Sequence, residues 1–293
     1  MKYVFENKVE FYITNVCNLT CQNCNRFNNH NFRGWQRWAD YADQYRRWAE
    51  LIDLRSIVIM GGEPLLNVTI TDWIRGLART FGAELQILSN GLHLNRVPDL
   101  YNSLIEASLF TKTIPSIGIS LHNFDHFETI KQNIKQFLGP IIDESREYPG
   151  IFYSCRDKNN VVINVYVVDH FFDAAVKSNG QGGFTLHNSN PREAFDVCGF
   201  ARFKSLHFIR GKIYKCGPAA LMPEFDLQYP LDISSQDRDL LHSYQPMTLD
   251  HWPQQHQTWM AALDDPIEQC KFCTVSGKKQ AIFPVVKNSK QAK

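Results

Sequence analysis

The sequence lacks the features that direct a chain to nucleic acid or into a membrane. It has 31 Lys and Arg against 30 Asp and Glu, a formal net charge of +1, so no excess of one sign favours nucleic acid or an anionic membrane surface. No stretch approaches ~18 consecutive apolar residues, the length of a membrane-spanning helix. Residues 1–8 include polar and acidic side chains where a signal peptide has its apolar run. We therefore expect a cytoplasmic protein with no nucleic-acid and no membrane partner.

Cysteine, by contrast, is present eight times in 293 residues. In a reducing compartment, clustered cysteines bind metal more often than they form disulfides. Three of them, Cys17, Cys21 and Cys24, stand close together near the N-terminus. A second set follows much later, at Cys198, Cys216, Cys270 and Cys273. We expect the remaining one, Cys155, to be a buried free thiol.

Apolar periodicity predicts alternating strands and helices over the first two thirds of the chain. Strands are predicted at residues 8–13, 56–60, 84–88, 116–121, 161–168 and 183–187. Helices with one apolar face are predicted around residues 41–52, 70–77 and 127–137. This alternation is typical of a parallel sheet, and six such units are too few for an eight-fold barrel of ~250 residues. We predict an α/β fold, a partial (β/α)6 barrel like an incomplete TIM barrel.

The pattern changes after about residue 197. Residues 203–214 predict a β-hairpin that turns at Arg210-Gly211. A Pro- and Gln-rich stretch follows from 218 to about 257, then a short helix and the pair Cys270 and Cys273. We therefore assign residues 1–197 to the partial barrel. Residues 198–293 are predicted to form a small, cysteine-ligated auxiliary domain that contains the hairpin and ends in a flexible basic tail.

The first cysteine set follows the first predicted strand directly. Three thiolates can hold three irons of a [4Fe–4S] cubane and leave the fourth iron open, whereas a zinc site usually recruits a fourth protein ligand. The spacing Cx₃Cx₂C at Cys17, Cys21 and Cys24 resembles the signature of the radical SAM superfamily. The resemblance implies that the open iron binds S-adenosylmethionine. One electron, from an external reductant of flavodoxin or ferredoxin type, then cleaves it to a 5′-deoxyadenosyl radical that abstracts a hydrogen atom from substrate.

A second motif follows the second predicted strand, where the superfamily has its GGE sequence. Here the residues are Gly61, Gly62 and Glu63. Glycines let the backbone approach a ligand closely, and a carboxylate can receive an ammonium group. The resemblance implies that Glu63 accepts a hydrogen bond from the methionyl amino group.

Polar residues on the next strands are further candidates for binding the cofactor. Ser89 and Asn90 end the third predicted strand, Ser120 ends the fourth, and Asn164 lies in the fifth. Ligands of parallel α/β sheets bind at the carboxyl ends of the strands. One departure is Asn23, at a position where the family commonly has an aromatic or apolar residue near the adenine. We expect Phe27 or another loop side chain to pack there instead.

The second cysteine set resembles the auxiliary domains of radical SAM enzymes. Cys216 stands five residues after Gly211, as in the opening of SPASM and twitch domains, and Cys270 and Cys273 add two thiolates. No cysteine follows Cys273, so the twitch domain, with one auxiliary [4Fe–4S] cluster, is the better match. The cysteine order most resembles that of the butirosin-pathway 2-deoxy-scyllo-inosamine dehydrogenase. The alternative is a Cys₄ zinc site that stabilises a small appendage.

These resemblances favour an oxidoreductase that modifies a small molecule at a C–H bond. A peptide-modifying radical SAM enzyme is the first alternative, and a zinc-stapled, non-enzymatic binding protein is the second. The catalytic residues stay unknown: His187 and His122 are candidate bases, but each is more typical of a packed or solvated histidine. Because the first strand is predicted near residue 8, we expect neither an N-terminal cobalamin domain nor a leader-binding domain.

Overall fold

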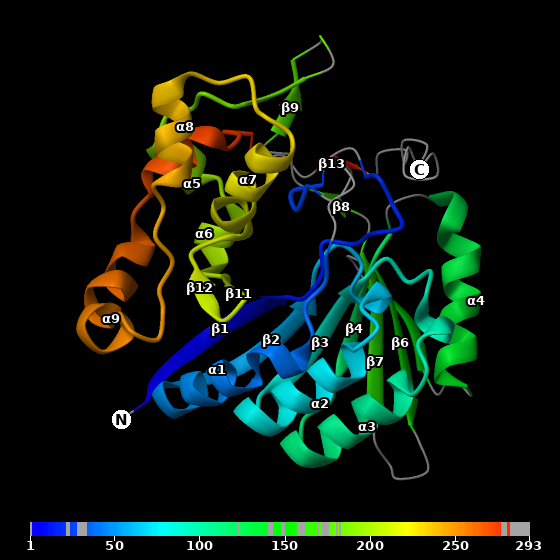
Figure 1. The fold of residues 1–293 in the computed structure, drawn as a ribbon. Helices are drawn as coiled ribbons and strands as arrows, with labels where there is room; N and C mark the ends of the chain where they lie inside the picture. Colours follow the sequence, from blue (N-terminus) through cyan, green and yellow to red (C-terminus); the bar gives the residue numbers. More distant parts are fainter. Residues whose placement is uncertain are drawn as a thin grey trace.

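The computed structural model describes residues 2–21, 24–27, 34–121, 124–139, 143–147, 150–156, 162–168, 170–171, 176–179, 181, 183–276 and 280–281. Its centre is a nine-stranded sheet (Figure 1). The strands, in spatial order, are β12 (Lys212–Tyr214), β11 (Leu206–Ile209), β1 (Tyr3–Tyr12), β2 (Ile52–Met60), β3 (Glu84–Ser89), β4 (Ser116–Ser120), β7 (Val162–Val168), β6 (Gly150–Arg156) and β5 (Asp143–Glu147).

The middle of this sheet is parallel, as predicted. The run from β11 through β1, β2, β3 and β4 to β7 is parallel throughout, whereas β12, β6 and β5 are each antiparallel to a neighbour. In the described part of the chain the edge strands β12 and β5 do not pair with each other. The sheet is therefore open, and the α/β fold with a partial barrel is confirmed.

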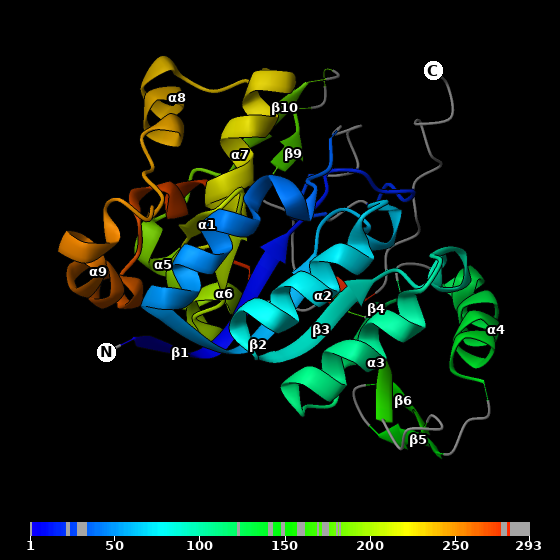
Figure 2. The same ribbon diagram turned by 60° about the horizontal axis from the view of Figure 1, so that its bottom comes forward.

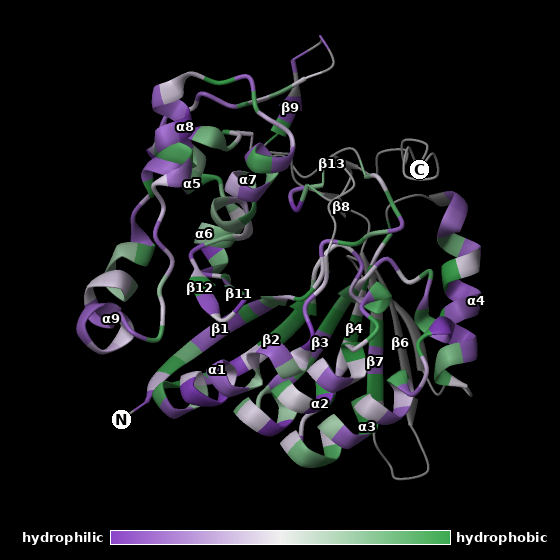
Figure 3. Ribbon diagram, in the orientation of Figure 1, coloured by the Kyte–Doolittle hydropathy of each residue, from purple (hydrophilic) through white to green (hydrophobic). Residues whose placement is uncertain are grey.

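Four helices cover one face of the sheet (Figure 2). They are α1 (Trp38–Leu51), α2 (Ile70–Phe81), α3 (Leu100–Thr111) and α4 (Phe127–Leu138). The predicted apolar face of α2 is fully buried, with Trp73, Ile74 and Leu77 at 0% exposure, and such side chains each contribute roughly 1.5–3 kcal/mol by leaving water. Figure 3 shows hydrophobic residues concentrated in the central strands and hydrophilic ones on the outer sides of the helices.

The segment after α4 differs from the prediction. The chain forms the antiparallel pair β5 and β6 before it reaches β7. The predicted sixth barrel strand at 183–187 is wrong in its placement: β10 (Phe184–Leu186) pairs antiparallel with β9 (Val176–Ser178), outside the main sheet. A short apolar run shows that a strand is present but not which strand it pairs with. Another two-stranded sheet joins β8 (His170–Phe171) and β13 (Gln280–Ala281).

The predicted hairpin is present as β11 and β12. Arg210 and Gly211 have φ of 50° and 73°, the paired positive values of a type I′ turn. The hairpin also pairs with the barrel, because β11 runs parallel to β1 with Glu10 opposite His207. The division between residues 197 and 198 stays a prediction, although the main sheet continues across it.

The Pro- and Gln-rich stretch is mostly helical. Residues 217–261 contain α7 (Gly217–Gln228), α8 (Ser235–His242) and α9 (Trp252–Ala261). Pro218 lies at the start of α7 and Pro223 inside it, so proline content alone did not exclude helix. Helices α7 and α8 pack around a second hydrophobic core that includes Leu221, Phe225 and Leu241, whereas Trp252 of α9 belongs to the first core.

Several shorter elements complete the chain. They are η2 (Pro64–Leu66), η3 (Leu94–Arg96), η4 (Phe124–His126), α5 (Pro191–Asp196), α6 (Gly199–Phe203), η5 (Ala262–Asp264) and η6 (Glu268–Phe272). No helix in the described ranges combines the length and apolar character that crossing a membrane requires. Asn23, His122 and the basic tail at 287–293 lie outside the described residues, and Cys155 is in β6.

Candidate functional site

The GGE segment and the first cysteine loop are held together by backbone hydrogen bonds. Gly62 N donates to Thr14 O at 2.8 Å, and Glu63 N donates to Val16 O at 2.8 Å. A Cβ at Gly61 would come within 2.5 Å of Thr14 O, so only glycine permits this approach. Val16, which directly precedes Cys17, is thus held beside the carboxyl end of β2.

Glu63 is a buried carboxylate that accepts three hydrogen bonds. Its Oε1 accepts from Leu65 N at 3.1 Å and Ser89 Oγ at 2.8 Å, and its Oε2 accepts from Asn90 N at 2.7 Å. The side chain belongs to a residue only 1% exposed. Burial raises the pKa of Glu63 to about 7, against the opposing effect of these three donors.

No Lys, Arg or His in the described part of the chain forms an ion pair with the Glu63 carboxylate. A buried carboxylate in this state favours either a proton or a bound cation. An ammonium group would supply both positive charge and N–H donors. Glu63 therefore fits a ligand with an amino group.

The predicted Ser89-Asn90-Gly91 turn lies against the cysteine loop. Ser89 Oγ accepts from Gly91 N at 2.9 Å, and Gly91 has φ of 76°, which favours glycine. Asn90 Nδ2 donates to Asn18 Oδ1 at 2.8 Å. Since Asn18 directly follows Cys17, this hydrogen bond connects the end of β3 to the cysteines.

The strand register separates the two remaining cofactor candidates. Ser120 pairs with Val168 at the carboxyl end of β4, and Asn164 pairs with Ser116 at its amino end. Through Ser116 and Gln86, Asn164 lies level with Val58 of β2, two residues before the end of that strand at Met60. Its role in cofactor binding stays a prediction. Ser120 lies at the predicted edge, where its role stays a prediction.

Cys17, Cys21 and Cys24 are each partly buried in the loop after β1. Leu19 N donates to Cys17 Sγ at 3.4 Å, and Cys24 N donates to Cys21 O at 3.2 Å. Phe27 is 1% exposed, and its ring lies 5.5 Å from that of Phe225 in the second core. Phe27 thus packs in the second core, and its expected contact with the adenine stays a prediction.

The second cysteine set surrounds one cavity. Cys198 precedes α6, Cys216 precedes α7, and Cys270 and Cys273 lie in and after η6. All four line a cavity of about 280 Å³, which exceeds by far the ~30 Å³ of one water molecule. The structure thus brings together four residues that are up to 75 positions apart in the sequence.

The thiols of this set are poor acids in the metal-free protein. Burial, together with neighbouring Cys198, raises the pKa of Cys216 to about 12. Burial also raises the pKa of Cys270 and of Cys273, the latter strongly. Four thiolates here need positive charge from a metal or cluster to form together.

Among the described side chains, no three His, Cys, Asp or Glu residues gather closely enough to hold a single metal ion. A mononuclear zinc site would need all four sulfurs at about 2.3 Å from one point. The choice between an iron–sulfur cluster and zinc at this cavity stays a prediction.

Sequence reasoning missed a buried charged group beside this cavity. Arg26 Nη2 and His207 Nε2 each lie 2.5 Å from Glu10 Oε2. The available signal was a charged residue at 10 and a histidine at 207, each between apolar residues in a strand. Without the pairing of β1 and β11, both positions look like a solvent-facing side of a strand. His187, the described candidate base, follows β10 and is partly buried.

Comparison with known families accounts for the first of these sites. Residues 11–145 match the model of the radical SAM superfamily. This segment of the chain is a radical SAM domain. It includes Cys17, Cys21, Cys24 and Glu63, and it ends before the second cysteine set. The family implies a [4Fe–4S] cluster and S-adenosylmethionine for the domain.

Solved structures of SuiB from Streptococcus suis resemble the chain weakly. SuiB bound to precursor peptide SuiA is 19% identical, covering 45% of this chain and 27% of that one, with a TM-score of 0.33. SuiB bound to S-adenosylmethionine is 18% identical, covering 45% and 26%, with a TM-score of 0.31. A third structure of SuiB is 11% identical, covering 85% of this chain and 65% of that one, with a TM-score of 0.36.

The chain therefore spans about a quarter of SuiB in the first two alignments. Likeness at this level leaves the substrate open. No curated protein sequence matches the chain.

Proposed function

We propose that this radical SAM domain binds S-adenosylmethionine between Glu63 and a [4Fe–4S] cluster on Cys17, Cys21 and Cys24. The observation that supports it most directly is the Glu63 carboxylate, which is buried, lacks a basic partner among the described residues, and is joined to the cysteine loop by backbone hydrogen bonds. When bound, the cofactor supplies a 5′-deoxyadenosyl radical, which removes a hydrogen atom from a substrate C–H bond.

The protein's own groups orient this cofactor. Ser89 Oγ and Asn90 N hold the Glu63 carboxylate in one position, where it receives the methionyl amino group. Asn90, through Asn18, fixes the loop that presents the cysteines. Since these contacts preexist, little side-chain entropy is lost on binding.

The C-terminal cysteines are the proposed ligands of one auxiliary [4Fe–4S] cluster. All four line one cavity of about 280 Å³, and the resemblance of their order to a twitch domain favours a cluster over the alternative zinc site. Four cysteine ligands leave no iron open, so such a cluster would accept or donate electrons, or hold substrate nearby. We retain oxidation of a small molecule as the proposed reaction, with a peptide substrate as its alternative and a flavodoxin- or ferredoxin-type reductant.

Iron analysis of two proteins tests both centres. The reconstituted wild type should hold about eight irons per chain, and Cys17/Cys21/Cys24→Ala about four, the content of one cubane. The triple variant should form no 5′-deoxyadenosine from S-adenosylmethionine. Continued formation of 5′-deoxyadenosine by this variant would contradict the cluster on Cys17, Cys21 and Cys24. Zinc in place of the remaining iron would contradict the auxiliary cluster. Product analysis with small-molecule and peptide pools then separates the substrate classes.

A further inference from the structure

A buried group of charged residues lies where the radical SAM domain meets the C-terminal helices. Arg26 is 5% exposed and lies with His207 against the Glu10 carboxylate, as described above. Burial would raise the pKa of Glu10, but His207 and Arg26 hold it at about 2, so Glu10 is ionised at neutral pH. Burial lowers the pKa of His207. The positive charge of this group is therefore that of Arg26.

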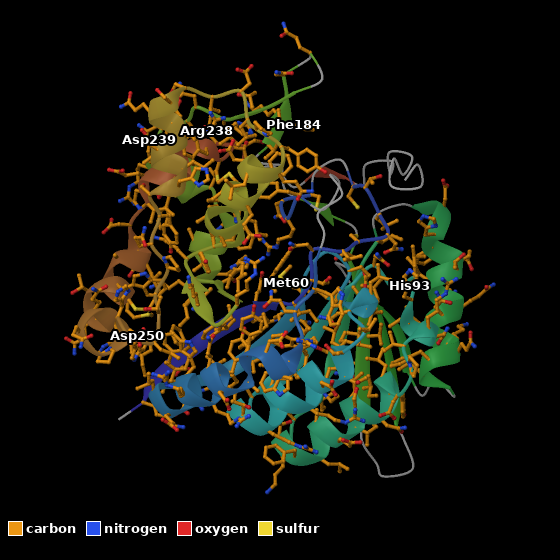
Figure 4. All side chains as sticks on the ribbon, viewed as in Figure 1. Met60, His93, Phe184, Arg238, Asp239 and Asp250 are labelled. Atoms are coloured by element: carbon orange, nitrogen blue, oxygen red, sulfur yellow. The ribbon has the colours of Figure 1, made fainter. Side chains whose placement is uncertain are left out.

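Arg26 contacts the segments that lead to both cysteine sites. It stands two residues after Cys24, and its Nη2 donates to the sulfur of Met60, which directly precedes Gly61, at 3.3 Å. Figure 4 shows Met60 at the junction of the sheet and the C-terminal helices. On the other side, the guanidinium carbon lies 5.0 Å from the centre of the Phe200 ring in α6.

The guanidinium also lies against the start of α7. A Cβ at Gly217 would collide with Arg26 Nη1, so glycine after Cys216 makes room for the charge. Arg26 Nε and Nη1 are buried and have no hydrogen-bond partner among the described residues. A buried guanidinium normally uses its donors. Two free donors beside Gly217 therefore indicate an absent acceptor on this side.

The C-terminal cysteine cavity lies next to this side of Arg26. Glu10, Asn25 and Phe200, which neighbour or contact Arg26, all line it. Lys215 is a further cation whose charge acts on Cys216 and Cys270, but unlike Arg26 Nη1 its Nζ has an acceptor, Ala262 O, and it also lies 4.8 Å from the Phe195 ring centre.

We propose that Arg26 is a positioning residue that holds the Cys17–Cys24 loop against the auxiliary site and raises the reduction potential of the cluster there. This inference depends on the proposed function, since it requires a cluster on Cys198, Cys216, Cys270 and Cys273. Reduction adds one negative charge to a cluster, and a buried cation in a medium of low dielectric constant stabilises the reduced form. The negative charge of Glu10 should instead lower the reduction potential of this cluster.

The test measures the midpoint potential of the auxiliary cluster alone. The background is full-length Cys17/Cys21/Cys24→Ala, in which the C-terminal site holds the only cluster, and the readout is a redox titration followed by electron paramagnetic resonance. Arg26→Gln should shift the potential downward, and Arg26→Lys should restore part of the shift. Glu10→Gln should shift it upward, and the double variant Glu10→Gln/Arg26→Gln should lie between the single variants.

Arg210→Gln is the matched control. Arg210 forms an ion pair with Glu224 on the surface of the same part of the chain, so its loss should leave the potential unchanged. An equal shift in Arg210→Gln and Arg26→Gln would overturn the inference, because it would indicate a general effect of charge or folding.

The outcomes separate this inference from the proposed function. A background protein without iron would remove the auxiliary cluster, and the role of Arg26 with it. The background protein could instead hold about four irons. If Arg26→Gln then leaves the midpoint potential unchanged, only the role of Arg26 would be overturned. If Arg26→Gln fails to assemble a cluster, Glu10→Gln decides, and an unchanged or lower potential in that variant would overturn the inference.

Discussion

The two cysteine sites of this chain differ in how their ligands are brought together. Cys17, Cys21 and Cys24 lie on one loop, so local sequence places them, and the neighbouring buried group is an unpaired carboxylate, Glu63. The C-terminal four come from three separated segments, and helices and strands must fold before they share a cavity. The first arrangement is therefore set by local sequence, whereas the second depends on the tertiary fold.

The difference also concerns charge. At the first site the protein supplies a negative group that requires a cation, and at the second it supplies thiols whose pKa is raised by burial. Each site is therefore less stable alone than with its ligand. Ligand binding should stabilise the two regions independently, and the following predictions test that separation.

The largest expected effect separates the sites by activity. Cys17→Ala should abolish 5′-deoxyadenosine formation, a loss of more than about a thousandfold, because cleavage needs the open iron. Cys198→Ala should keep cleavage of S-adenosylmethionine and lose substrate turnover. Chromatographic assay of 5′-deoxyadenosine and of product checks both. Loss of cleavage in both variants would show that the sites are not independent.

Replacing Glu63 should weaken cofactor binding without removing iron. Glu63→Gln keeps the size of the side chain and loses its charge, and a hydrogen bond to a charged group contributes about 1.5–3 kcal/mol. We expect S-adenosylmethionine affinity to fall by about 10- to 100-fold, measured by equilibrium dialysis. Asp72→Asn, an exposed carboxylate in α2, is the control. An unchanged affinity in Glu63→Gln would exclude the assigned role.

Alkaline pH should destabilise the metal-free second site. The Cys216 pKa is raised from 9.0 to about 12 in the folded state, so the folded chain keeps a proton that the unfolded chain releases. Its contribution is fully present below about pH 9 and is lost as pH rises toward 12. Between pH 9 and 10.5 we expect roughly 2 kcal/mol less stability, measured by urea unfolding under reducing conditions.

Cys216→Ser provides the comparison for that measurement. Serine does not titrate in this range, so the variant should lose less stability with pH than the wild type. Identical slopes would contradict the raised pKa. The reconstituted protein should show no such loss, because a bound cluster keeps the sulfurs as thiolates.

Cofactor binding at the first site should show the opposite pH response. The Glu63 pKa is raised from 4.5 to about 7, and an ammonium group binds its ionised form. S-adenosylmethionine affinity should therefore rise about fivefold from pH 6 to pH 7 and level off above about pH 8. Without cofactor the sign reverses: the Glu63 contribution to folding is present below pH 4.5 and is lost as pH rises through 7. A pH-independent affinity would contradict this assignment.

The sequence predicted the local parts of this arrangement well. The cysteine loop, the GGE segment and the Ser89-Asn90 turn are short motifs at the ends of strands, and a parallel sheet places such ends together. The role of Asn164 stays a prediction, because a strand's apolar pattern does not reveal its register, which places Asn164 opposite Ser116.

The group formed by Glu10, Arg26 and His207 was beyond local reasoning for a different reason. It depends on the pairing of β1 with β11, nearly 200 residues later, and on Gly217 admitting the guanidinium. The misplaced sixth strand has a similar cause, because Phe184 finds its partners in β9 and at Leu231. Nonlocal pairing is what the sequence pattern left undetermined at both positions.

The smallest expected effect concerns the link between the turn after β3 and the cysteine loop. Asn90→Ala removes the 2.8 Å hydrogen bond to Asn18 but keeps the Asn90 backbone N–H that binds Glu63. A single neutral hydrogen bond contributes about 0.5–1.5 kcal/mol, so cofactor affinity should fall about threefold to tenfold, with iron content unchanged. Asn90→Ala also removes the 3.1 Å hydrogen bond from Leu92 N to Asn90 Oδ1, so Asn18→Ala should have a similar or smaller effect. The double variant should add little to Asn90→Ala, because the two changes share the hydrogen bond between Asn18 and Asn90. Additive losses would show that Asn90 contacts the cofactor itself.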